Sequence, residues 1–206
     1  MQPRSDDRDF AAYNAAQRGR PVRPLARRAV DALPGVDHGE TGVRPSSPVA
    51  IELGSGAGIE ARFLAESGFH VHALDGDPSV RPQLDMLHET HGIAPVIADL
   101  ETLDALPAAD LILSCAALPF IRREAFDPLW TLVREALHPG GVLAADLFGD
   151  RDDWAGTEGT FLSRGEVEDL LDGLEVLELA EEERDGRSFA GPKHWHTFQV
   201  LARRPF

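Results

Sequence analysis

A glycine-rich segment, Glu52-Leu53-Gly54-Ser55-Gly56-Ala57-Gly58, is the part of the sequence best suited to bind a ligand. Glycines between a strand and a helix allow a tight turn, and they let a ligand approach the backbone because no Cβ is in the way. Asp75 lies about 20 residues further on, at the end of the next expected strand, where an acid can bind ribose hydroxyls. Because such turns also serve dinucleotides, the glycines alone do not define the ligand.

Two details of the turn argue against a dinucleotide. The dinucleotide pattern has glycine at its first, third and sixth positions, whereas here Ile59 is sixth and Gly58 comes one residue early. Glu52 ends an otherwise apolar strand, where its carboxylate would repel a pyrophosphate but would suit an ammonium or sulfonium group. An NAD-dependent oxidoreductase is therefore the weaker alternative. A purely structural role stays open for both acids, with Glu52 as an anion at a helix N-terminus and Asp75 as a strand-end residue.

The elements that must position these residues alternate between strand and helix from residue 48 onward. We expect strands at 49–53, 69–74, 95–98, 110–114, 142–147, 174–179 and 197–202, and helices at 58–67, 78–90, 122–137 and 163–171. This alternation predicts βαβ units and a parallel sheet. The last two strands have only Gly186 and Gly191-Pro192 between them, without a clear helix, which predicts an antiparallel pair at the sheet edge.

The N-terminal part differs from this pattern. Apolar residues at helical spacing, interrupted by Gly19-Arg20-Pro21, predict two short helices. We interpret residues 1–33 as a helical lid, residues 34–47 as a linker rich in Pro, Gly and Ser, and residues 48–206 as the main domain. The arginines at 18, 20, 23, 27 and 28 make the lid basic, either as an arm that guides anions or as a solvated helix face.

Composition limits the classes of function. The chain of 206 residues has a formal net charge of −15, which repels phosphate backbones and argues against a nucleic-acid partner. No apolar run approaches the roughly 18 residues of a membrane span. The polar start lacks the apolar stretch of a signal peptide, so we expect a cytoplasmic protein with no membrane partner. The single cysteine, Cys115, excludes an internal disulfide and a cysteine metal cluster.

The glycine turn, Glu52 and Asp75 together resemble the class I S-adenosylmethionine (SAM)-dependent methyltransferases. The resemblance covers roughly residues 48–147. It implies an α/β, Rossmann-like fold with a seven-stranded sheet, mostly parallel with an antiparallel last strand, and with helices on both faces. It also implies SAM as the cofactor and methyl transfer as the activity, although a non-catalytic SAM-binding sensor or partner protein remains an alternative.

The same resemblance implies which residues hold the cofactor. The glycines would line its methionine part, Asp75 its ribose and Asp99-Leu100 its adenine, with Ser114-Cys115 beneath the sulfonium. The expected cofactor-binding set is Glu52, Gly54, Ser55, Gly56, Gly58, Asp75, Gly76, Asp99, Leu100, Ser114 and Cys115. No triad can be derived for Cys115 from spacing alone, so a small buried side chain is the simpler interpretation of it than a nucleophile.

A narrower resemblance concerns the last third of the chain. Phe148 to Asp152, Trp154, residues 160–164 and residues 193–196 look like a bacterial group related to tellurite-resistance methyltransferases. This implies a small-molecule methyl acceptor such as a thiol, a chalcogen oxyanion or another soft nucleophile. Methyl transfer of this kind needs alignment of the acceptor and exclusion of water more than it needs strong acid–base chemistry.

Candidate acceptor residues come from three separate segments. Asp150 and Trp154 follow the fifth strand, at the carboxyl edge where ligands bind in open α/β sheets. His194 and His196 alternate along one strand, so they share a face and could clamp the acceptor or act as a general base together with Asp150. Tyr13 and Arg18 of the lid would complete the acceptor pocket. The opposing interpretation makes the histidines part of a solvent-facing edge strand, and no third ligand for a metal site is evident.

Overall fold

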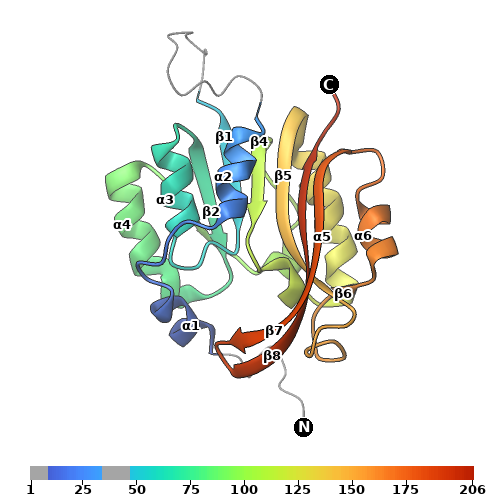
Figure 1. Cartoon of the computed structure of the whole chain (residues 1–206). Coiled ribbons are helices and arrows are strands. Elements are labelled where there is room, and N and C mark those ends of the chain that lie inside the picture. Colours follow the sequence, from blue (N-terminus) through green and yellow to red (C-terminus); the bar gives the residue numbers. More distant parts are fainter. Residues whose placement is uncertain (1–8, 34–46) are drawn as a thin grey trace.

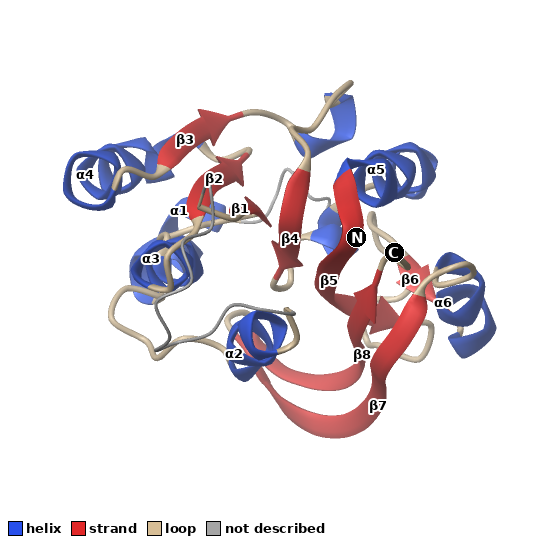
Figure 2. Cartoon of the chain, turned by 90° about the horizontal axis from the view of Figure 1, so that it is seen from above, coloured by secondary structure: helices blue, strands red, loops and turns tan. Residues whose placement is uncertain are grey.

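The structure is a computed structural model that describes residues 9–33 and 47–206. One mixed sheet runs through it in the order β3-β2-β1-β4-β5-β8-β7, with the short strand β6 paired to β5 (Figures 1 and 2). The strands are β1 Val49–Leu53, β2 His70–Asp75, β3 Ala94–Ile97, β4 Ala109–Ser114, β5 Leu137–Gly149, β6 Phe161–Leu162, β7 Glu175–Ser188 and β8 Gly191–Arg203.

The first five of these strands are parallel, and β8 runs antiparallel between β5 and β7. The predicted α/β fold with an antiparallel last strand is thus confirmed, and β6 adds an eighth, two-residue strand to the expected seven. The helices are α1 Phe10–Ala16, α2 Pro24–Asp31, α3 Ile59–Glu66, α4 Arg81–His91, α5 Arg123–Ala136 and α6 Arg164–Leu170.

Two apolar cores, one on each face of the sheet, hold the helices in place. Side chains of α5 and α6, such as Phe126, Trp130 and Val167, pack on one face. Side chains of α2, α3 and α4, such as Leu25, Leu64 and Leu84, pack on the other. Figure 2 shows these helix groups on opposite sides of the strands. None of the helices in the described ranges is long and apolar enough to cross a membrane.

Local sequence signals explain several element boundaries. The predicted capping box at α6 is present, since the Ser163 N–H donates to Glu166 Oε2 (2.8 Å) and the Glu166 N–H donates to Ser163 Oγ (3.3 Å). Gly92, at φ +70°, ends α4. Two short N-terminal helices form as expected, but residues 34–46 of the predicted linker lie outside the described residues.

The C-terminal strand pair is longer than predicted. Its pairing continues from Glu175↔Arg203 to Ser188↔Gly191, far beyond the end of the β5–β8 pairing at Phe148↔Thr197. The charged run Glu181 to Arg187 lacks the apolar alternation of a half-buried strand, but it forms the exposed edge of the hairpin, where charges are favoured. We call the part of the hairpin beyond the β5 pairing, residues 183–196, the hairpin arm; it extends toward α1 (Figure 1).

Candidate active site

The glycine turn joins β1 to α3 at the carboxyl edge of the sheet. The N–H groups of Gly54 and Ser55 donate to the Leu74 carbonyl (2.8 and 2.9 Å), which ties the turn to the end of β2. Gly54 and Gly56 have φ values of +74° and +50°, a region that only glycine adopts at little cost. A Cβ on Gly54 would lie 2.1 Å from Ala117 Cβ, so the turn also approaches the loop after β4.

Asp75 closes the same corner from the end of β2. Its Oδ2 accepts the Gly56 N–H (2.7 Å) and its Oδ1 accepts the Asp77 N–H (2.8 Å), while only 9% of the residue is exposed. Burial raises the pKa of Asp75, and the two backbone hydrogen bonds partly oppose that rise. Each carboxylate oxygen has a further lone pair, so the side chain can still accept two hydroxyl groups.

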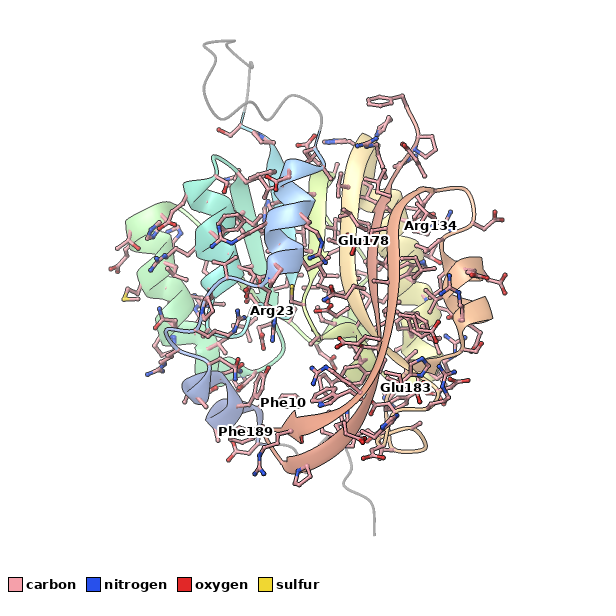
Figure 3. All side chains as sticks on the ribbon, in the orientation of Figure 1. Phe10, Arg23, Arg134, Glu178, Glu183 and Phe189 are labelled. Atoms are coloured by element: carbon pink, nitrogen blue, oxygen red, sulfur yellow. The ribbon has the colours of Figure 1, made fainter. Side chains whose placement is uncertain are left out.

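A cavity of about 850 Å³ opens in front of these groups, a size typical of small-molecule sites. It lies between the carboxyl ends of β1 and β4. The chain continues from β1 to β2 on one side and from β4 to β5 on the other, and open α/β sheets bind ligands at such a switch point. Of the residues predicted from the sequence, it is lined by Tyr13, Gly54, Ser55, Gly56, Asp75, Gly76, Asp99, Leu100 and Cys115. Helix α1 contributes a wall, and Figure 3 shows its Phe10 on the same side of the molecule as Arg23.

Three of the predicted cofactor residues do not line the cavity. Gly58 begins α3 at φ +72°, and a Cβ there would lie 2.4 Å from Leu87 Cδ1, so this glycine permits the packing of α3 on α4. The Ser114 hydroxyl is buried and donates to the Leu53 carbonyl (3.2 Å). Glu52 is also buried, and its Oε2 has no hydrogen-bond partner among the described residues.

The buried carboxyl of Glu52 lies next to charged neighbours behind the glycine turn. Burial, together with Glu60, raises the pKa of Glu52 well above its ordinary value, although Arg20 and Arg23 oppose this. An ionised carboxylate with an unpartnered oxygen is costly in such a buried place, which agrees with the raised pKa of Glu52.

A buried ion pair beneath the lid was missed by the sequence analysis. Arg20 donates from both terminal nitrogens to Glu60 (2.6 and 2.5 Å), and the Arg23 N–H also donates to Glu60 (3.0 Å). Burial opposes ionisation of Glu60, but these hydrogen bonds outweigh it and lower the pKa of Glu60. An acid in the first turn of a helix is common for helix stability alone, so its partner 40 residues away could not be inferred from the sequence.

Arg23 connects the lid to the loop after β4. Its Nη1 donates to the Cys115 carbonyl (3.1 Å) and its Nη2 to the Tyr13 hydroxyl (3.3 Å). Burial raises the pKa of the Cys115 thiol well above its ordinary value, so this side chain is a protonated, small apolar group, not a nucleophile. Ala116, next to it, has φ +63°, a strained conformation of the kind found at ligand sites.

The three catalytic candidates lie away from the cavity. His196 is fully buried; its Nδ1 accepts the Arg151 N–H (3.1 Å), and its Nε2 lies 3.0 Å from Glu181 Oε1 and 3.1 Å from Arg151 Nη2. His194 lies on the exposed hairpin arm, where hydrogen bonds to Asp185 and Glu183 raise its pKa. Asp150 lies 3.4 Å from His196 and is half-exposed. The predicted histidine clamp on the acceptor is therefore not formed in this structure.

Of the remaining acceptor candidates, one lines the cavity and two do not. Tyr13 lines the cavity, whereas Arg18 is exposed on the outside of the lid. Trp154 does not line the cavity, but its ring packs 6.1 Å from that of Phe120, which does. Trp154 thus packs behind Phe120 and supports the cavity wall without lining it.

Lys193 explains why Trp154 lies where it does. The Lys193 ammonium pairs with Asp152 (2.7 Å), and both side chains are almost completely buried. It also lies 3.6 Å from the ring centres of Trp154 and Trp195. This cluster anchors the hairpin arm to the loop after β5, so the segments expected to form the acceptor site instead support its wall. Among the described residues, no group of three or more His, Cys, Asp or Glu side chains is placed to hold a metal ion.

Comparison with known proteins gives a consistent result. Residues 51–145 match the family model described as a methyltransferase domain. TehB from Haemophilus influenzae is similar in structure, with 17% identity and a TM-score of 0.75 over 95% of this chain and 67% of that chain. A 1,6-didemethyltoxoflavin-N1-methyltransferase from Burkholderia thailandensis gives 20% identity and a TM-score of 0.65 over 98% and 83%.

N-methyltransferase NodS from Bradyrhizobium japonicum is a further similar structure, with 18% identity and a TM-score of 0.63 over 98% of this chain and 99% of that chain. At such identities these likenesses show the fold alone. No curated protein matches the chain by sequence.

The fold is that of the class I SAM-dependent methyltransferases, and the domain match spans the strands that carry the glycine turn and Asp75. The matched methyltransferase domain, residues 51–145, and the methyltransferase fold together indicate a SAM-dependent methyltransferase activity with SAM as the cofactor.

Proposed function

We propose that the enzyme methylates a small-molecule acceptor that binds in the cavity between the glycine turn and helix α1. The observation that carries this proposal is the shared cavity: one part of its lining, the first wall, holds the glycine turn and Asp75, and another part, the second wall, holds Phe10, Tyr13 and Phe120. A methyl donor and an acceptor bound on these two walls would face each other, and the lid helix would keep water away from them.

The residues on the first wall fit SAM. We assign Asp75 to the ribose hydroxyls and Asp99-Leu100, which lie next to Gly76, to the adenine end. We assign Arg23 to the carboxylate, because this guanidinium lines the cavity and makes no ion pair with any described acid within 4 Å. When bound, SAM supplies a methyl group already activated by its sulfonium.

The protein's own part in the reaction is to bind and to orient. Asp77 of the first wall accepts a hydrogen bond from Asn14 Nδ2 (3.1 Å) of helix α1, and Asn14 Oδ1 would lie 2.8 Å from a Cβ on Gly56. The lid therefore contacts the glycine turn directly. This contact supports a closed arrangement in which the acceptor is held against the cofactor side of the cavity.

The acceptor stays a proposal at the level of chemical class. The sequence favours a soft nucleophile such as a thiol or a chalcogen oxyanion. Two of the compared proteins are N-methyltransferases by name, and the structure of one of them has 1,6-didemethyltoxoflavin and S-adenosylhomocysteine bound. The apolar rings of the second wall support an acceptor with an apolar face, which a small oxyanion lacks.

Calorimetry with SAM, S-adenosylhomocysteine and NAD tests the proposed function. We expect the first two to bind with one site per chain and NAD to give no binding heat. Incubation with SAM and a mixed acceptor panel should then release S-adenosylhomocysteine. Tight SAM binding without release on any acceptor would favour a SAM-binding sensor, and an absence of SAM binding would refute the proposal.

A further inference from the structure

The charges around the cavity are strongly unbalanced. Among the described residues that line it, the carboxylates are Asp9, Glu60, Asp75, Asp77, Asp99, Glu101 and Glu158, and the guanidinium groups are Arg20, Arg23 and Arg122. This excess of negative charge lines a concave site, where the protein focuses its field. Beyond the cofactor carboxylate that we assign to Arg23, this field therefore disfavours an anionic acceptor.

The cations of the cavity are already engaged by the protein. Arg20 forms its bidentate pair with Glu60, and Arg122 pairs with Glu101 through its side chain and its backbone N–H. Arg23 donates to the Cys115 carbonyl and to Tyr13, and in our proposed function it also meets the cofactor carboxylate. None of the three is a spare counter-charge for an anionic acceptor.

The second wall has flat, apolar surfaces. Phe10 of α1 packs edge-on against Phe120, with ring centres 5.6 Å apart, and Phe120 continues into the rings of Phe148 and Trp154. Ile121 completes this wall. Such a surface binds a planar ring by burial of apolar area and by ring–ring contact.

The negative charge around the cavity favours some acceptor atoms over others, because their charge changes differently during methyl transfer. A thiol or a phenol reacts as its anion, and the excess of carboxylates opposes formation of that anion. A neutral nitrogen reacts through its lone pair and becomes more positive during the transfer, so the same carboxylates stabilise the charge that develops. Nitrogen is thus the acceptor atom that this electrostatic environment favours.

We propose that the methyl acceptor is a planar aromatic or heteroaromatic compound with an uncharged nitrogen nucleophile, held against the wall formed by Phe10, Phe120 and Ile121. This inference rests on the proposed function. The nitrogen lone pair forms the new N–CH₃ bond, the CH₃–S bond breaks, and sulfur keeps its electron pair. The nitrogen gains the positive charge, and a nitrogen that carries hydrogen then releases one proton to solvent.

The test measures binding to the enzyme loaded with S-adenosylhomocysteine, so it does not depend on turnover. Three bicycles of similar shape serve as probes: isoquinoline with a neutral ring nitrogen, naphthoate with a carboxylate, and naphthalenethiol, with tellurite as a small oxyanion. We expect isoquinoline to bind at least about tenfold more tightly than naphthoate or tellurite. Incubation with SAM should methylate isoquinoline in preference to the thiol, which mass spectrometry detects.

Two variants with matched controls separate the causes. Glu158→Lys reverses a charge in the cavity lining and should reduce the preference for isoquinoline over naphthoate severalfold, whereas Glu89→Lys on the exposed face of α4 should leave it unchanged. Phe10→Leu should weaken isoquinoline binding without affecting S-adenosylhomocysteine. Phe206→Leu, at an exposed residue outside the cavity lining, is its control.

Naphthoate or tellurite that binds as tightly as isoquinoline would overturn the inference, and so would isoquinoline that fails to bind the loaded enzyme. A preference that Glu158→Lys leaves unchanged would contradict its electrostatic basis. The proposed function fails in a distinguishable way, because the enzyme would then bind neither SAM nor S-adenosylhomocysteine.

Discussion

Replacement of Asp75 by asparagine tests the assignment of the cofactor ribose most directly. The substitution keeps the shape and one acceptor oxygen, but it replaces the other oxygen with an amide that cannot accept the Gly56 or Asp77 N–H. The charge is lost as well, so a bound ribose hydroxyl loses a charge-assisted acceptor. A hydrogen bond to a charged group contributes about 1.5–3 kcal/mol. SAM affinity should therefore fall by roughly 10- to 150-fold.

Asp110→Asn is the matched control for this variant. Asp110 also accepts a backbone N–H, that of Val49 (2.8 Å), but it lies at the amino end of β4, on the opposite edge of the sheet. Calorimetry should show weaker SAM binding for Asp75→Asn alone, while thermal unfolding reports any loss of stability in both variants. Equal SAM affinity in Asp75→Asn and wild type would refute the ribose assignment.

Three further predictions concern stability and pH. Gly58→Ala should lower the free energy of unfolding by about 2–5 kcal/mol, because overlap of its Cβ with a leucine of α4 adds to the backbone strain at φ +72°. Gly92→Ala, with a similar φ and nothing within 4 Å, should cost only the backbone strain of about 1–2 kcal/mol in the same urea titration. Lys193→Met leaves Asp152 buried without its cation and should cost about 3–5 kcal/mol, whereas an unchanged urea midpoint would show that the pair is dispensable. SAM affinity should fall as pH decreases through the raised pKa of Asp75, since the protonated carboxyl loses acceptor capacity; Asp75→Asn should remove that dependence in calorimetry at several pH values.

That the glycine turn and Asp75 line one cavity could be predicted because their signals are local. The glycine turn and Asp75 each follow directly from a strand, and parallel neighbouring strands bring their carboxyl ends to one edge. Gly58 was predicted to line the cavity and does not. A glycine is required at position 58 because Leu87 of α4 packs against it. The sequence does not show that α3 and α4 lie this close together.

The acceptor side could not be predicted, because it depends on contacts between distant segments. His194 and His196 alternate as expected, but the loop after β5 folds over His196 and buries it beneath Gly149. The hairpin arm is stabilised by the Lys193–Asp152 pair across the sheet edge. The spacing of apolar residues and the composition do not predict such a pair. A lysine or an aspartate taken by itself is usually solvated, so the sequence gives no reason to bury either one.

The basic N-terminal segment had two interpretations, an arm that guides anions and a solvated helix face. The structure divides its arginines between packing contacts and the solvated face. Arg20 pairs with Glu60, and Arg28 pairs with Glu178 of β7 (3.0 Å), so these two are counter-charges that attach the lid to an acidic domain. Arg18 and Arg27 are exposed, as a solvated helix face would have them. Because Arg20 and Arg28 are already paired with carboxylates, they offer little attraction to a free anion, which agrees with an uncharged acceptor.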